Sequence, residues 1–197
     1  MPDSGIADGA VFTSSFYDTY IRQQVVVVCT SGTRPTGVEG RRIYETDTDR
    51  ELVYNGTSWC IVGGAGAWIA FSGTLTNVTE GNGTKVGFYS RTGLRTIHWY
   101  VKFTLGSTST IGGLIGVALP VTAAADAVAP GIARLHVAGA SRPGYYSMAS
   151  TTRVDLFAIY AANTYGETSN TSATVPATWT TADYFHVGGT YEAATAA

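Results

Sequence analysis

The chain has 197 residues, of which 45% are hydrophobic and 12% aromatic but only 13% charged, about half the roughly 25% of an average soluble protein. Its net charge of −2 and its scattered basic residues give no field that attracts a polyanion, so we expect no nucleic-acid partner. The longest apolar run, residues 25–28 followed by Cys29, is far shorter than the roughly twenty residues that span a bilayer, so we expect no membrane insertion.

The N-terminus and the cysteines predict synthesis in a cytoplasm. Residues 1–10 contain two Asp, no basic residue and no apolar core of the signal-peptide type. The two cysteines, Cys29 and Cys60, are too few for a disulfide framework. We therefore expect both thiols to be free and partly buried, with a single Cys29–Cys60 bridge as the alternative.

Charge density and glycine content divide the chain. Residues 1–62 hold 13 charged side chains, and residues 63–197 hold the other 13 over more than twice the length. The break coincides with residues 63–67, Gly-Gly-Ala-Gly-Ala, which form a flexible linker by composition. We predict a docking and oligomerisation segment at 1–62, a linker at 63–67 and one larger domain at 68–197.

A short helix is predicted near the N-terminus. Thr13, Ser14 and Ser15 can cap a helix that runs to about residue 24, with Phe16 and Tyr20 on one side of it. A helix of about three turns is marginal alone. Its aromatic stripe must therefore pack against the rest of the chain or against copies of itself in an oligomer.

A small β-meander is predicted next. Residues 41–44, 51–54 and 58–62 have strand character, with turns at residues 46–49 and at Asn55-Gly56. Asn-Gly between apolar residues is the strongest short-range hairpin signal. The meander has too little area to form a core unaided.

The larger domain alternates apolar and polar residues in the manner of sandwich strands. In residues 95–105, Trp99, Val101 and Phe103 lie on one face, and Tyr100 and Lys102 lie on the other. About eight strands follow from such segments, separated by turns that include residues 112–113, 139–144 and 163–170. We predict a mainly β chain whose larger domain is an antiparallel, jelly-roll-like β-sandwich.

No residue pattern predicts catalysis, a metal or a cofactor. His98, His136 and His186 fall mid-strand at spacings that match no metal signature, which favours a structural or surface role. Glu45, Asp47 and Asp49 resemble a calcium loop but lack its Gly and final Glu, so they are interpreted as an acidic hairpin turn. The six carboxylates after residue 63 fall mostly at predicted turns or strand ends. We therefore expect a protein that is not an enzyme.

Aromatic residues are the candidates for binding. Tyr145, Tyr146, Tyr165 and Trp179 are predicted in or beside loops, where their rings could stack on sugars or anchor a protein. Aromatics in an all-β chain more often fill a core or an interface. Both interpretations stay open at this point.

Residues 32–59, GTRPTGVEGRRIYETDTDRELVYNGTSW, resemble a module of tail-fibre, minor-tail and related virion proteins of tailed bacteriophages. The preceding residues 16–22 are similar to the helix that opens such proteins, and the region from Trp68 resembles, more loosely, the β-sandwich tips that end them. The resemblance implies a homotrimer in the virion, docked on other virion proteins through its N-terminal part and facing the host through its sandwich. The docking residues would be Phe16, Tyr20, Tyr44, Tyr54 and Trp59, and no catalytic residue is implied.

The favoured hypothesis is thus a short trimeric tail fibre or appendage subunit that contacts a host-surface glycan. A capsid decoration or head-fibre protein is the alternative of the same origin. A free glycan-binding β-sandwich module and a polysaccharide-degrading enzyme are alternatives of other classes.

Overall fold

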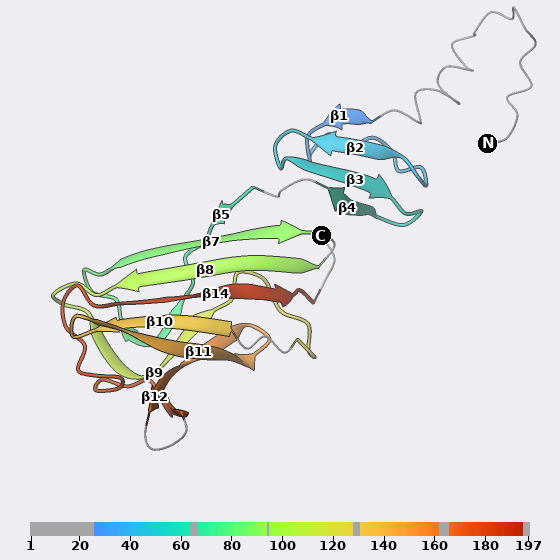
Figure 1. The fold of residues 1–197 in the computed structure, drawn as a ribbon. Helices are drawn as coiled ribbons and strands as arrows, with labels where there is room; N and C mark the ends of the chain where they lie inside the picture. The colour runs from blue at the N-terminus through green and yellow to red at the C-terminus, as the bar shows by residue number, and fades with distance from the viewer. Residues whose placement is uncertain (1–25, 64–66, 94, 128–130, 162–165, 195–197) are drawn as a thin grey trace, which may run out of the picture. The chain divides into compact units, whose positions relative to one another are not determined.

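The computed structural model describes residues 26–63, 67–93, 95–127, 131–161 and 166–194 (Figure 1). The chain divides into two compact units, Met1–Gly64 and Ala65–Ala197, and this division falls within residues 63–67. The fold is mainly β, since the described ranges form strands and turns and contain no helix. The predicted helix with Phe16 and Tyr20 lies outside the described residues. Of the residues that are described, none belongs to a helix long and apolar enough to cross a membrane.

The first unit is a four-stranded sheet in the order β1-β2-β3-β4. Its strands are β1 (Val27–Cys29), β2 (Arg42–Glu45), β3 (Arg50–Tyr54) and β4 (Trp59–Gly63). The antiparallel meander β2-β3-β4 is confirmed, with each strand within one residue of its predicted bounds. Strand β1 was not predicted, because three residues are too few to show alternation. Its parallel pairing with β2 also depends on the path of the connecting residues 30–41.

The first unit has a small core of its own. Ile43, Leu52 and Ile61 are buried on one face, opposite one another in the strand register. Val27, Cys29 and Trp59 pack against them. Cys29 and Cys60 carry free thiols and are both half-buried.

The Asn55-Gly56 hairpin turn is confirmed. The Asn55 side-chain oxygen Oδ1 accepts the N–H groups of Thr57 (2.9 Å) and Ser58 (2.8 Å). Gly56 has a φ of 91°, a left-handed conformation that favours glycine. The turn thus fixes the register of β3 and β4.

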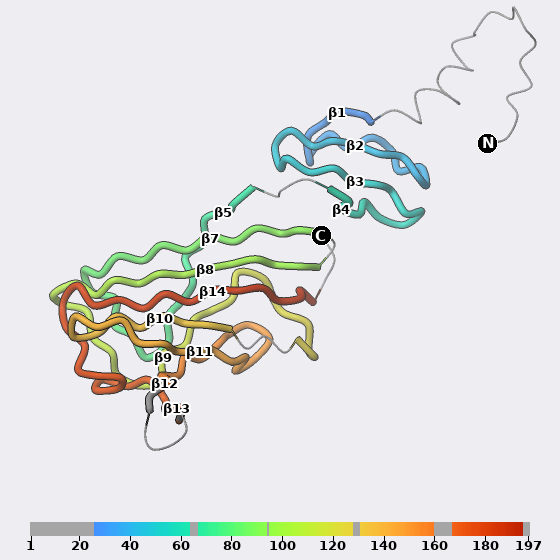
Figure 2. Tube along the Cα trace, in the orientation of Figure 1, coloured from blue at the N-terminus to red at the C-terminus, as the bar shows by residue number. Residues whose placement is uncertain are grey.

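The second unit is one antiparallel sheet of ten strands in the order β5-β7-β8-β14-β10-β11-β12-β9-β6, with β13 paired to β12 beside this path (Figures 1 and 2). Its strands are β5 (Ile69–Ala70), β6 (Leu75–Thr79), β7 (Thr84–Thr92), β8 (Thr96–Thr104), β9 (Thr110–Ala118), β10 (Gly131–Val137), β11 (Ala140–Ser150), β12 (Arg153–Ala161), β13 (Gly166–Asn170) and β14 (Tyr184–Glu192).

This sheet curls on itself, and a short segment joins its two ends. β5 and β6, at opposite ends of the strand order, are connected by residues 71–74. The N–H of Phe71 donates to Gly87 O in β7 (3.0 Å), and Thr74 O accepts from the N–H of Ala118 in β9 (2.9 Å). The curl encloses one hydrophobic core.

The core contains the interior faces of the alternating strands. The prediction for residues 95–105 is confirmed: Trp99, Val101 and Phe103 of β8 are buried. Phe103 packs on Phe185 of β14 with ring centroids 5.7 Å apart. β9 and β12 contribute further buried residues, Ile115, Val117, Val154 and Leu156.

Three predicted turns differ from the structure, and the two strands beyond the predicted eight are β5 and β13. Gly112 and Gly113 lie inside β9, and residues 166–170 form β13. β11 already begins at Ala140, because the actual turn is at Ala138 and Gly139, whose φ values are 53° and 72°. Glycine serves inside this strand for close packing: a Cβ on Gly144 would lie 2.7 Å from Phe157 O of β12.

Tyr191 yields a prediction about alkaline stability. Its buried hydroxyl donates to Val121 O (2.7 Å) and accepts from Val121 N (3.1 Å), and burial raises the pKa of Tyr191 to about 12. The unfolded chain releases this proton near pH 10, so stability falls as the pH rises from about 10 to about 12. Tyr191→Phe is expected to lose about 1 kcal/mol at pH 7 and to show a smaller alkaline decline. Urea unfolding at pH 7 and pH 11 measures both effects, and an unchanged alkaline decline in the variant would contradict this assignment.

Candidate functional site

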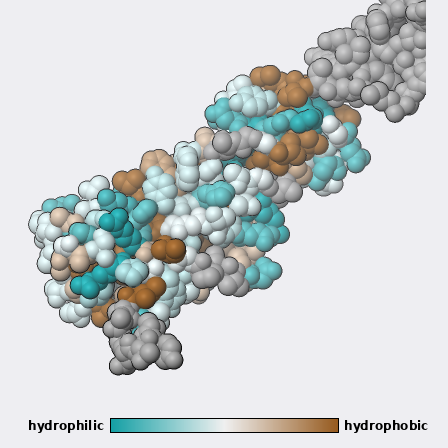
Figure 3. Space-filling view, viewed as in Figure 1, coloured by the Kyte–Doolittle hydropathy of each residue, from teal (hydrophilic) through white to brown (hydrophobic). Residues whose placement is uncertain are grey.

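The outward residues of three neighbouring strands form the candidate site. The register places Lys102 of β8 beside His186 of β14, His186 beside Arg134 of β10, and Tyr184 beside His136. Because adjacent strands are about 4.8 Å apart, these side chains make one continuous surface. We call the surface the aromatic–cationic face and define it by Tyr100, Lys102, Arg134, His136, Tyr184 and His186. Figure 3 shows isolated hydrophobic residues among hydrophilic ones on the near side of the second unit.

Ring contacts order this face. His136 stacks on Tyr184 with centroids 4.8 Å apart and planes 13° from parallel. Tyr100 meets His186 edge to face at 5.8 Å. Trp68, which is 55% exposed, packs on Tyr100 from the side of β5. These contacts hold ring surfaces ready for a ligand at little further entropic cost.

Two cations lie on the same face, and neither has a carboxylate partner among the residues that the structure describes. Lys102 Nζ is 4.5 Å from the centroid of the Tyr184 ring, and Arg134 Cζ is 5.8 Å from it. Arg134 Nη2 also donates to Ser141 Oγ (2.8 Å). None of the ion pairs between described residues includes Lys102 or Arg134. The face therefore carries uncompensated positive charge beside aromatic rings.

A shallow hollow opens on this face. It has a volume of about 440 Å³, and its lining includes Tyr100, Arg134, His186 and Ile132, which is 82% exposed. Gly188 also lines it, at a point where a Cβ would lie 2.6 Å from Trp99 O. Glycine at this position thus lets β14 lie close to β8 beside the hollow.

The charge of His186 depends on its neighbours. Partial burial lowers the pKa of His186 most, and the like charges of Lys102 and Arg134 lower it further. We expect His186 to titrate below its ordinary pKa of about 6.5 and thus to be neutral at pH 7. Lys102→Gln removes one like charge and should raise the pKa of His186. NMR titration of the imidazole measures this; Lys85→Gln, which alters a lysine paired with Glu80, should leave it unchanged.

The aromatic residues predicted to bind do not form one exposed site. Tyr146 is a correction: it lies within β11, not a loop, and is only 1% exposed, because its ring faces the core. Tyr145 faces outward but is half-buried and stacks on Phe157 at 4.8 Å. Trp179 is half-buried against the core and donates Nε1–H to Ser172 O (2.9 Å). Tyr165 lies outside the described residues.

The predicted docking residues of the first unit differ in exposure. Tyr44 is 37% exposed on the face opposite the core, and its hydroxyl donates to Asp49 Oδ1 (3.0 Å). Tyr54 meets Trp59 edge to face at 5.3 Å, and both are half-buried. Tyr44 thus offers the most accessible ring of the three.

The sequence contained part of the signal for the aromatic–cationic face. Alternation in residues 95–105 already placed Tyr100 and Lys102 on the polar side of their strand. His136 and His186 were interpreted as structural or surface residues, and the fold adds the pairing that joins them to Arg134 and Tyr184. His98, by contrast, bonds to the hydroxyls of Thr92 and Thr190.

The six residues that define this face are of three chemical kinds. They are two cations, two tyrosines and two histidines, and no carboxylate is among them. In the part of the chain that the structure describes, no three His, Cys, Asp or Glu residues group so as to hold a metal ion.

No family model, curated protein or solved structure matches the chain. Its function must therefore be inferred from its own residues and geometry.

Proposed function

We propose that this chain is a structural subunit of a tailed-bacteriophage particle, a short trimeric tail fibre or appendage that attaches to the host surface through the aromatic–cationic face. The observation that carries the attachment role is the uncompensated pair Lys102 and Arg134 set among aromatic rings. The virion assignment rests on the resemblance of residues 32–59 to the phage module. The protein acts by binding and not by catalysis.

An anionic surface glycan is the ligand that this chemistry suits. Sugar rings stack on tyrosine and tryptophan faces, and acidic substituents pair with Lys and Arg. A nucleic acid is less suitable, because a DNA-binding protein often makes roughly six to ten phosphate contacts and this face offers two cations. Each contact is weak. Three copies on one axis would raise the apparent affinity by about 10²-fold or more.

The two units would have different roles, host contact for the second and docking for the first. The curled sheet would act as a rigid, jelly-roll-like sandwich tip, because its interior aromatic and aliphatic side chains are buried in one core. The first unit would dock on other virion proteins of the tail and on neighbouring subunits through Tyr44, Tyr54 and Trp59, together with Phe16 and Tyr20. The exposed Tyr44 supports this role.

Adsorption of the purified full-length protein to host cells tests the proposal. Tyr184→Ala and Lys102→Gln should each lower binding at least about tenfold, which corresponds to a total of about 1.4 kcal/mol. Arg42→Gln is the charge-matched control, because Arg42 lies in the first unit and pairs with Glu51. Equal binding by all three variants would overturn the attachment role of this face.

Other measurements separate the alternatives. Light scattering should give a trimer; a monomer would favour a free glycan-binding module. Electron microscopy of labelled particles should place the subunit on the tail, and a label on the head would favour a capsid decoration or head-fibre protein. Release of reducing sugar from host polysaccharide would favour an enzyme.

A further inference from the structure

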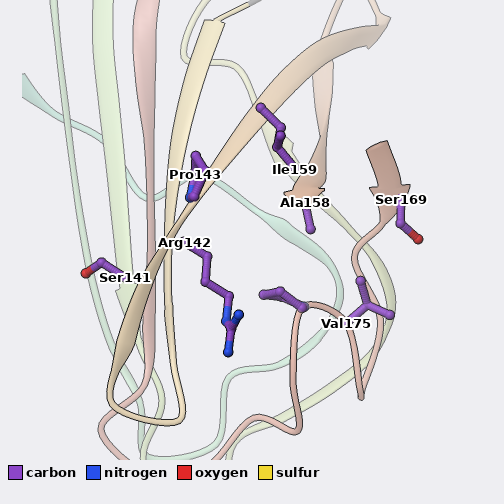
Figure 4. A pocket seen from close by; sticks show the side chains of 8 residues that line it. Ser141, Arg142, Pro143, Ala158, Ile159, Ser169 and Val175 are labelled. Carbon is purple, nitrogen blue, oxygen red and sulfur yellow. The ribbon is translucent and has the colours of Figure 1, made fainter. Parts of the chain in front are cut away.

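A second cavity lies among β11, β12, β13 and the segment after β13. It has a volume of about 580 Å³, within the range of ligand pockets, which is roughly 300–1,000 Å³. Figure 4 shows the Arg142 side chain reaching from β11 toward the segment that carries Val175. The neighbouring residues Ala158 and Ser169 are paired across β12 and β13.

Arg142 is a half-buried cation with unused hydrogen-bonding capacity. Its Nε is buried and has no hydrogen-bond partner, and Arg142 takes part in no ion pair between described residues. Buried polar groups in proteins nearly always have a partner, and an unsatisfied one is costly. A guanidinium offers a planar fork of N–H donors that matches a carboxylate or a phosphate. The unused donors therefore indicate an anionic ligand.

The other walls of the cavity restrict what that ligand can be. Pro143, Ile159, Val175 and Pro176 supply apolar surface, and Ser169 supplies a hydroxyl. Among the described residues that line the cavity, there is no carboxylate and no second cation. One positive charge is balanced by one negative charge, and the apolar walls suit the ring face of a pyranose. A sugar with a single carboxylate meets all of these conditions.

We propose that this cavity binds a carboxylate-bearing sugar unit of an acidic polysaccharide, with Arg142 paired to the carboxylate and Pro143 and Ile159 against the ring. Binding here is independent of whether the aromatic–cationic face attaches to a host. The two sites nevertheless adjoin along the chain: Ser141, which accepts from Arg134, also lines this cavity next to Arg142. An acidic polymer long enough to reach both sites would therefore meet cations at each.

The test titrates the full-length protein with D-glucuronate, D-glucose or D-glucose 1-phosphate. Calorimetry and the NMR signal of the Arg142 Nε–H measure the binding. Glucuronate should bind and shift that signal, while glucose should bind at least about tenfold more weakly. Arg142→Gln should lower glucuronate affinity at least about tenfold, and Arg142→Lys should restore only part of it. Lys102→Gln, a change on the aromatic–cationic face at a residue that does not line this cavity, should leave glucuronate affinity unchanged.

Several results would overturn the proposal. One is the absence of glucuronate binding at about 10 mM, a concentration at which even a weak ligand site would be filled. Another is equal glucuronate affinity in Arg142→Gln and the wild type. The third is tighter binding of glucose 1-phosphate than of glucuronate. A thermal transition of Arg142→Gln at or above that of the wild type would show that lost binding is not lost folding. If that variant unfolds instead, the test rests on the wild-type protein alone: an Arg142 Nε–H signal that glucuronate does not shift would overturn the proposal. Because host adsorption is measured on Tyr184→Ala, failure of one proposal leaves the other testable.

Discussion

Replacing Tyr146 with alanine is expected to lower the free energy of unfolding by about 3–5 kcal/mol, the range for large aromatic side chains in a core. Tyr146 is 1% exposed and packs edge to face on Trp99 with ring centroids 5.7 Å apart. Its ring fits because Gly131 and Gly189 flank it: a Cβ on either glycine would overlap Tyr146. Truncation would leave a cavity that the surrounding sheet cannot close.

Tyr145→Ala is the matched control, because the two residues are adjacent and face opposite sides of β11. Tyr145 is half-buried and stacks on Phe157, so its loss should cost only about 1–2 kcal/mol. Urea unfolding of both variants, monitored by near-ultraviolet circular dichroism, measures the difference. Equal losses would contradict the assignment of Tyr146 to the core. Gly189→Ala should also destabilise the second unit, since the new methyl group needs the space of the Tyr146 hydroxyl.

A second large effect is expected in the first unit, where Arg34→Ala should cost about 3 kcal/mol. Glu45 is fully buried, its Oε1 accepts from Arg34 Nε, and its Oε2 accepts from Thr48 Oγ1 (2.7 Å). Removing one partner of a buried ion pair leaves an uncompensated charge, which costs roughly 3–5 kcal/mol. We expect the low end of that range, because Arg34 is 37% exposed and water already reaches it.

Hydrogen exchange over residues 42–63 reports on the first unit separately. A loss of about 3 kcal/mol corresponds to about 100-fold faster exchange if these amides exchange by opening of the unit. Arg42→Ala is the control, because Arg42 and Glu51 are 52% and 28% exposed and a surface pair contributes at most about 1 kcal/mol. Similar acceleration in the two variants would show that the buried pair does not stabilise this sheet.

Local signals in the sequence predicted the local parts of the fold. The Asn55-Gly56 turn and the alternation in residues 95–105 depend on neighbours in sequence, and both are confirmed. Glycine was the main source of error, because it was interpreted as a turn signal at Gly112, Gly113 and Gly144. Inside β11, Gly144 instead allows β12 to approach closely, and such packing has no mark in a single sequence. A Cβ on Gly112 or Gly113 would make only ordinary contacts with Asn77, so β9 includes them without such a need.

The candidate site could be predicted only in part, because it depends on strand order. Alternation identified the outward side of β8, but Lys102 and Arg134 flank His186 only because β14 lies between β8 and β10. Tyr146 was misplaced for the same reason, since its position also depends on strand pairing. The glycines at 139 and 144 favoured a loop beside Tyr146 in the sequence. The pairing of β11 with β10 and β12 instead makes Tyr146 a core residue.

The central position of β14 has a consequence for biosynthesis. β14 is the last strand of the described chain, yet it lies between β8 and β10 and separates β5-β7-β8 from β10-β11-β12-β9-β6. A ribosome releases the N-terminal strands first, so a nascent chain holds two incomplete sheet portions with unpaired edges until residues 184–192 emerge. Tyr184 and His186 arrive with that same strand. A prematurely terminated subunit would therefore lack both the closed sheet and the complete aromatic–cationic face.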